Sequence, residues 1–232
     1  MDGLLGTTQQ ALQLLLTGNP ELWTIVGISF SVSLKAIVFT TPVAFVLAFV
    51  LAYVDFPGNR LLLSMFNSLL SVPTVVVGLL LYMLLSRQGP LGDLKLLFTQ
   101  TAMMLAQMVL CFPILVALGH AAMQAADRRA WETARTLGAP PWHAMLTVLY
   151  EVRFGLIAAV LTGFGRIISE VGASMMVGGN IKYHTRTLAT ATALETARGE
   201  FSRGVAMSLI LLAMALIVTF TIAWFGRTRE SQ

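Results

Sequence analysis

Long apolar runs separated by short polar stretches dominate the chain. A bilayer core of about 30 Å is crossed by roughly 20 apolar residues in an α-helix. Five segments are long enough to do so: 22–54, 61–86, 101–120, 152–178 and 204–225. The pattern predicts an all-α integral membrane protein, a bundle of about five transmembrane helices in which residues 1–232 form a single transmembrane domain.

The first apolar segment has a clear start but is longer than one perpendicular crossing. Asn19, Pro20 and Glu21 supply a helix cap, a proline suited to the first turn and an acidic residue near the positive end of the helix dipole. We expect the early half of the segment to lie at the membrane interface and residues 36–54 to cross the core.

The composition agrees with a membrane protein and excludes several other classes. Hydrophobic residues make up 56% of the chain and charged residues 11%, against about 25% charged in soluble domains. The single cysteine, Cys111, excludes an internal disulfide framework, and His120, His143 and His184 show no metal-ligand spacing. No basic run is interleaved with aromatic residues, so we expect neither a metal site nor a nucleic-acid partner.

The placement of Lys and Arg in the connecting loops sets the predicted orientation. With the N-terminus outside, the inner loops carry Arg60, Arg128, Arg129, Arg135, Arg153, Arg227 and Arg229. The outer loops carry Arg87, Lys95, Lys182, Arg186, Arg198 and Arg203. The compact cluster at 128–135 and the basic C-terminus favour an extracytoplasmic segment 1–20, a cytoplasmic loop at about 125–151 and a cytoplasmic C-terminus.

The loop 125–151 is predicted to be a helix-turn-helix. Asp127 is a good N-cap for a first helix reaching about Leu137, and Gly138 supplies the left-handed residue that often ends a helix. Pro141 suits the first turn of a second helix, which we expect to run on into the fourth span. Trp131 and Trp142 offer contact area to a partner, although a solvated connector between two spans would use the same caps.

The sequence of this elbow resembles a signature of ABC importers. Residues 132–138, Glu-Thr-Ala-Arg-Thr-Leu-Gly, are similar to the EAA-x3-G motif of their permease subunits, and an aliphatic residue follows ten positions after the glycine. Thr133 departs from the usual alanine, and Tyr150 and Glu151 stand where Leu-Pro is usual. The resemblance implies ATPase-coupling roles for Glu132, Ala134, Gly138 and Val148.

A longer stretch, Gly163 to Phe201, resembles tungstate-type permeases, which are relatives of molybdate and sulfate permeases. The similarity extends over about 20–228. It implies a type I ABC importer permease fold in a prokaryotic cytoplasmic membrane, a homodimer, a cytoplasmic ABC ATPase dimer holding ATP and magnesium, and an extracytoplasmic oxyanion-binding protein. The chain has no G-x-x-x-x-G-K-[ST] sequence, so we expect no cofactor and no enzymatic activity of its own.

Two ionisable residues fall in the fourth apolar segment. Arg166 and Glu170 are four residues apart, on one face of a continuous helix. Each costs about 2.5–3.5 kcal/mol or more inside a bilayer, so such groups pair or face a cavity. Arg166 is the better anion contact, since an ionised Glu170 repels an oxyanion. A purely structural ion pair is the alternative. Gly172 and Ser174 are small enough to leave room for a pathway.

The stretch 180–203 follows on the predicted outer face and is rich in cations and hydroxyls. Its cations are Lys182, Arg186, Arg198 and Arg203, and its threonines are Thr185, Thr187, Thr190 and Thr192. Donors and positive potential suit a tetrahedral oxyanion, and the resemblance favours this over lipid-headgroup contact. Together with Arg166, Glu170, Gly172 and Ser174, Thr185 and Arg186 complete the candidates for the translocation pathway.

These features predict the membrane-spanning permease subunit of an ATP-driven importer for tungstate. Molybdate and sulfate are tetrahedral dianions too, so permeases for these two anions are the nearest alternatives. An ion-coupled secondary transporter without an ATPase is a different class, which the elbow motif disfavours. A non-transporting membrane scaffold would leave the intramembrane Arg166 and Glu170 without a purpose.

Overall fold

The computed structural model describes residue 13 and residues 20–230, and this part of the chain contains helices and no strand. The helices are α2 (Pro20–Tyr53), α3 (Asn59–Leu69), α4 (Thr74–Leu85), a 3-10 turn at Gly92–Leu94, α5 (Gln100–Gln124), α6 (Arg128–Thr136), α7 (Pro141–Glu151), α8 (Arg153–Ile168), α9 (Gly172–Gly178), α10 (Leu188–Ala197) and α11 (Phe201–Glu230). The predicted all-α class is confirmed.

The centre of the bundle is the pair α2 and α5. Ala36, Ala44 and Cys111 are completely buried in one shared core cluster. A Cβ on Gly119 of α5 would lie 3.2 Å from the Ala48 Cβ. Small residues thus allow the two helices to approach closely, as they do in other membrane bundles.

The first span is one continuous helix, and its early half is packed within the bundle. α2 runs for 34 residues, through Pro42. Ile25, Ile28 and Val32 are buried, and the Ser29 hydroxyl accepts a hydrogen bond from the Leu188 amide at 2.8 Å. This half therefore packs against elements from the far end of the sequence, and its position at the membrane interface stays a prediction.

The second and fourth spans are broken, whereas the sequence pattern predicts continuous segments. α3 and α4 meet at 99°, and α7 and α8 meet at 75°. α8 then ends at Ile168, and α9 begins only at Gly172. The expected lever, a second elbow helix continuous with the fourth span, is thus wrong: the chain bends sharply at Val152.

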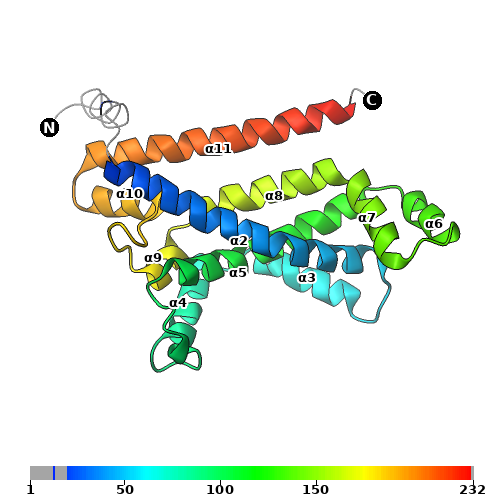
Figure 1. Ribbon diagram of the computed structural model, residues 1–232, viewed down its shortest axis with the longest axis horizontal. Helices are drawn as coiled ribbons and strands as arrows, with labels where there is room; N and C mark the ends of the chain where they lie inside the picture. The colour runs from blue at the N-terminus through cyan, green and yellow to red at the C-terminus, as the bar shows by residue number, and fades with distance from the viewer. Residues whose placement is uncertain (1–12, 14–19, 231–232) are drawn as a thin grey trace.

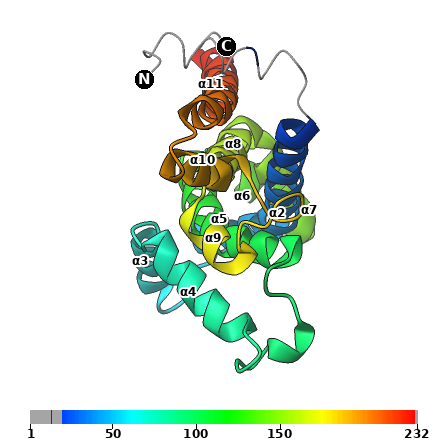
Figure 2. The ribbon, with the colours of Figure 1, turned by 90° about the vertical axis from the view of Figure 1, so that its left-hand side faces the viewer.

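The elbow α6–α7 forms one end of the bundle, and α10 with the loop before it forms the other (Figure 1). α2 and α11 both begin at the α10 end and run towards the elbow end, while α3 and α4 lie at the edge of the bundle, apart from α11 (Figures 1 and 2). The predicted extracytoplasmic segment 1–20 lies outside the described residues except for positions 13 and 20, and the membrane orientation stays a prediction.

Candidate functional site

The elbow has the helix-turn-helix form that its sequence predicts. The Asp127 carboxylate accepts a hydrogen bond from the Arg129 amide at 2.9 Å, which caps α6. Gly138 has a φ of +83°, and Pro141 opens α7. A Cβ on Gly138 would meet nothing within 4 Å, so glycine is required here by the backbone conformation and not by lack of space.

The inner face of the elbow rests on the end of α2. The Trp131 ring lies 5.3 Å from the Phe49 ring and 5.6 Å from the Tyr53 ring, measured between centroids. The Arg128 guanidinium donates to the Ala52 carbonyl at 3.3 Å. Trp131 therefore belongs to the internal packing, although its sequence position suggested a partner contact. The contacts join the elbow directly to the first span.

The outer face of the elbow is exposed and partly apolar. Leu137, Trp142 and Tyr150 are 83%, 56% and 70% exposed. Among the predicted coupling residues, Glu132 and Gly138 are exposed, Ala134 is half-buried, and Val148 is completely buried beneath the elbow. Val148 thus packs between the elbow and the rest of the bundle, whereas Glu132 and Gly138 are accessible to a partner protein.

The Arg166–Glu170 pair lies at the break in the fourth span. The guanidinium and carboxylate are 3.0 Å apart, with Arg166 49% exposed and Glu170 3% exposed. The second carboxylate oxygen accepts a hydrogen bond from the Ala173 amide at 3.1 Å. Glu170 is therefore past the end of α8, where it caps α9 as well as pairing with Arg166. Arg166 keeps donors free on its exposed side.

The break in the fourth span meets the break in the second. A Cβ on Gly172 would lie 2.8 Å from Val75 Cγ2 and 3.2 Å from Thr74 Oγ1, at the start of α4. A Cβ on Gly78 of α4 would lie 2.7 Å from the Ala173 Cα. Gly172 is thus needed for close packing of α9 on α4, and its place beside a pathway stays a prediction. Broken helices of this kind are common near substrate sites in membrane transporters.

Two buried polar side chains lie next to this break, one on α9 and one on α5. Ser174, a predicted pathway residue, is buried, and its hydroxyl has no partner among the described residues. Gln107 of α5 donates its amide to the Ile167 carbonyl at 3.2 Å and so holds the end of α8. Gln107 is a functional candidate that the motifs did not indicate, although a carboxamide within an apolar span is a detectable signal in the sequence.

Thr185 and Arg186 hold the loop between α9 and α10 in place. The Thr185 hydroxyl accepts from the Ile181 amide at 2.9 Å and donates to the Gly178 carbonyl. Arg186 is only 7% exposed, and its guanidinium lies 3.8 Å from the carboxylate of Glu21. Thr185 and Arg186, two of the predicted pathway residues, are therefore buried within the protein.

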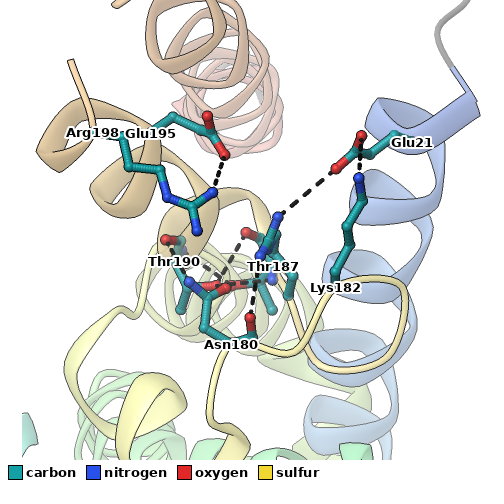
Figure 3. A network of polar contacts seen from close by, with 8 residues as sticks. Glu21, Asn180, Lys182, Thr187, Thr190, Glu195 and Arg198 are labelled. Atoms are coloured by element: carbon teal, nitrogen blue, oxygen red, sulfur yellow. Dashed lines mark hydrogen bonds and ion pairs between the residues drawn. The ribbon is translucent and has the colours of Figure 1, made fainter. Parts of the chain in front are cut away.

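The other charges near this loop are also largely paired (Figure 3). The Lys182 ammonium lies 3.0 Å from the Glu21 carboxylate, whose hydrogen bond raises the pKa of Lys182. Arg198 lies 3.7 Å from the buried carboxylate of Glu195. The positive charge expected from the sequence is thus reduced by two acidic residues.

The loop also contains a buried hydroxyl network. The side chains of Thr187 and Thr190 form a reciprocal capping box at the start of α10. Thr190 donates to the Asn180 side chain at 3.0 Å. These threonines satisfy one another, so they do not offer free donors to an anion.

Comparison with known proteins gives consistent matches over most of the chain. The family model described as binding-protein-dependent transport system inner membrane component matches residues 41–230. The tungstate uptake system permease of Campylobacter jejuni is 42% identical over 176 residues, which are 76% of this chain and 74% of the relative. The tungstate uptake system permease of Peptoclostridium acidaminophilum is 36% identical over 91% of this chain and 93% of the relative.

A more distant relative and two solved structures extend these matches. The molybdenum transport system permease of Escherichia coli is 32% identical over 90% of this chain and 95% of its own. An inward-facing methionine ABC transporter has a TM-score of 0.67 at 18% identity, over 93% and 96% of the two chains. An amino acid ABC transporter has a TM-score of 0.65 at 16% identity, over 92% and 96%. The fold is that of an ABC importer permease.

Proposed function

The chain belongs to the family of binding-protein-dependent transport system inner membrane components, and we propose that the oxyanion it carries is tungstate. The observation that supports this choice is the identity of 42% and 36% to two tungstate uptake permeases, against 32% to a molybdenum permease. The protein is thus the multi-pass membrane subunit of an ABC importer, and tungstate is the substrate to test first.

The working importer that we propose contains two copies of this chain, two ATPase subunits and an extracytoplasmic oxyanion-binding protein. ATP and magnesium bind the ATPase subunits, since this chain has no phosphate-binding loop sequence. The exposed outer face of α6 and α7 supports docking of each ATPase at the elbow. The N-terminus is extracytoplasmic and the C-terminus cytoplasmic in this assembly.

ATP-driven closure of the ATPase dimer moves the two elbows, and the contacts of the elbow determine where that motion goes. Trp131 packs on Phe49 and Tyr53 of α2, so displacement of α6 pushes on the first span. α7 joins α8 through a 75° bend, which turns a movement along the membrane surface into a movement of the fourth span. Small shifts of this kind switch a packed bundle between two arrangements.

The site at the broken helices suits a dianion because its acidic group is already neutralised. Glu170 is paired with Arg166 and with the Ala173 amide, so it offers little repulsion. The half-exposed Arg166 guanidinium supplies charged donors, which bind oxyanions more strongly than neutral donors do. Molybdate and sulfate share this chemistry, and the extracytoplasmic binding protein makes the selection among the three anions.

The test is reconstitution of the permease with its ATPase and binding protein in liposomes. We expect ATP-dependent uptake of tungstate that exceeds uptake of molybdate and sulfate and persists when ion gradients are dissipated. Equal uptake of the three anions would overturn the substrate assignment. Uptake that collapses with the ion gradient and proceeds without ATP would instead assign the protein to the secondary transporters.

A further inference from the structure

One face of α3 is polar and uncovered by the rest of the chain. Five exposed polar residues lie on α3 and in the turn after it: Arg60, Ser64, Asn67, Ser68 and Ser71. Their spacing of three and four residues places them on one side of a helix. Phe66 on the opposite side is buried in the main core cluster. We call this exposed set the α3 polar face.

The α3 polar face lies near the middle of the bundle. The Phe66 ring is 5.8 Å from the ring of Phe112, measured between centroids. Phe112 stands halfway along α5, which runs from Gln100 to Gln124. Asn67, the neighbour of Phe66, is thus at a depth where a membrane-facing residue would meet hydrocarbon and not headgroups.

An exposed carboxamide at this depth needs a polar neighbour. Ser68 can face lipid, because its hydroxyl donates to the Ser64 carbonyl at 2.9 Å. The Asn67 side chain has two N–H donors and a carbonyl, and this carboxamide forms no hydrogen bond to the described residues. Towards α2 the surface at a similar depth is apolar, because Phe39 and Val43 of α2 line one groove with Leu69 of α3. Leu69 is two positions from Asn67 and thus on the opposite side of the helix, so the α3 polar face points away from this apolar groove.

The charges near the α3 polar face suit an anion. Arg60 and Arg87 flank the second span, and residues 59–87 contain no Asp or Glu. The face ends at the break before Thr74, which packs against Gly172 beside the Glu170 carboxylate. The half-exposed partner of Glu170, Arg166, belongs to this same junction. Hydroxyl and amide donors thus lead to the broken helices without an intervening unpaired carboxylate.

We infer that the α3 polar face lines the passage through which the oxyanion crosses the membrane, and that the Asn67 carboxamide donates hydrogen bonds to the anion near the middle of that passage. The inference rests on the proposed function for the class of substrate. A water-filled passage satisfies Asn67 between transport events, and the tetrahedral anion replaces those waters during transport. Packing of the same face against a second copy of the chain is the competing arrangement.

Thiol accessibility separates these arrangements, and the chain is suited to it because its single cysteine, Cys111, is buried. In a Cys111→Ala background that retains uptake, we would prepare Asn67→Cys and the matched control Val43→Cys, which is exposed on the apolar side of α2. Each importer, with its ATPase subunits, is placed in lipid nanodiscs and treated with 2-sulfonatoethyl methanethiosulfonate, an anionic reagent that does not enter lipid.

We expect Asn67→Cys to react at least about tenfold faster than Val43→Cys, because hydrocarbon excludes the charged reagent from the control. Millimolar tungstate should slow the Asn67→Cys reaction. In the wild-type cysteine background, Asn67→Leu should reduce uptake by roughly tenfold or more through loss of a hydrogen bond to a charged ligand, whereas Val43→Leu should transport normally.

Labelling of Asn67→Cys no faster than the control would overturn the inference. Ready disulfide formation between two Asn67→Cys copies without labelling would overturn it too, and would assign the face to the subunit interface. The proposed function fails separately, on uptake by the wild-type importer: equal uptake of the three anions, or uptake without ATP, overturns it without changing the labelling result. Fast labelling with tungstate protection supports the passage, whichever oxyanion the wild-type importer prefers.

Discussion

The two ends of the bundle differ in how their polar residues are used. At the α10 end, every residue from Thr185 to Ala191 is buried, and its hydroxyls and cations are bonded within the chain. At the elbow end, Ala144 and Val148 are the buried residues among the described side chains of α6 and α7. The first end is a closed network, and the second is an exposed surface, where we propose that the ATPase docks.

This contrast indicates that the elbow end is the part that moves and that the α10 end keeps the bundle together. Regions with few buried contacts open at low free energy, and moving elements are commonly drawn from them. The elbow has this character and is attached to the bundle mainly through Trp131 and α7. The α10 end ties α2 to the last third of the chain through Glu21 and Ser29. Changes at the elbow should therefore affect coupling, and changes at the α10 end should affect stability.

The largest effect is expected from Gly138→Pro in the elbow. Proline fixes φ near −65°, whereas Gly138 has a φ of +83° and an amide that donates to the Arg135 carbonyl at 3.1 Å. The turn cannot form, and we expect loss of ATPase co-purification and at least about tenfold lower uptake. Pull-down of the ATPase and liposome uptake measure the two effects.

Glu132→Lys tests the same surface without disturbing the turn, since Glu132 is exposed on α6. We expect the reversed charge to weaken ATPase binding while the thermal stability of the permease is unchanged. Normal assembly and uptake in both Gly138→Pro and Glu132→Lys would contradict an ATPase-docking role for the elbow.

An intermediate effect is expected from Trp131→Ala, which removes the contact between the elbow and α2. Full truncation of a core aromatic costs about 3–5 kcal/mol, and the half-buried Trp131 should cost about 2 kcal/mol on the same scale. We expect ATP hydrolysis to continue while uptake falls, because the elbow still docks but no longer pushes on α2. The uptake-to-hydrolysis ratio measures this uncoupling.

The control for that variant is Trp142→Ala, on the exposed outer face of α7. Its side chain is 56% exposed, so its loss should leave the stability of the permease nearly unchanged and weaken ATPase binding instead. The same ratio of uptake to hydrolysis in the two variants would show that Trp131 has no special role in transmitting motion.

Local chemistry made the elbow predictable from the sequence. The cap at Asp127, the left-handed turn at Gly138 and the proline start at Pro141 each depend on residues within a few positions. The number of apolar segments was predictable for a similar reason, since it follows from bilayer thickness. The structure confirms the elbow at nearly the expected residues. For the five predicted segments, the described residues contain two helices long and apolar enough to cross a membrane, or up to four if each bent pair counts as one span.

The breaks in the spans were not predictable, because tertiary contacts decide them. Pro42 and Pro113 lie inside continuous helices, whereas Pro73 precedes a sharp bend. The break after Ile168 contains no proline and is held by the Glu170 carboxylate and by Gln107 from α5. A proline in a membrane helix therefore marks a place that can bend, and distant neighbours determine whether it does.

The burial of Thr185 and Arg186 was not predictable from the sequence either, because it also depends on tertiary contacts. Arg186 is paired with Glu21, which lies near the opposite end of the sequence. A pattern of cations and hydroxyls indicates an anion site only where no distant carboxylate pairs with the cations. Asn67 is a carboxamide in an apolar span, as Gln107 is, but only the structure shows that Asn67 is exposed and Gln107 is buried.

The smallest effect is expected from Glu21→Gln at the α10 end, which removes a charge from the pairs with Lys182 and Arg186 while keeping a polar side chain. Solvent screens the exposed Lys182 ammonium, so loss of its pair with Glu21 should cost little stability. We expect the melting temperature of the detergent-solubilised permease to fall by a few degrees at most, with ATPase binding unchanged.

The pH dependence of that loss distinguishes an ion pair from simple packing. The carboxylate raises the pKa of Lys182 above its ordinary value of 10.5, so the folded state binds this proton more tightly than the unfolded state does. The pair's contribution to the free energy of unfolding is then complete below pH 10.5 and is lost as the pH rises through the raised pKa. The difference in melting temperature between wild type and Glu21→Gln should therefore be constant from about pH 6 to 9. It should shrink above pH 10.5 as Lys182 loses its proton, so a difference that persists unchanged there would assign the loss to packing and contradict the Lys182–Glu21 pair as its source.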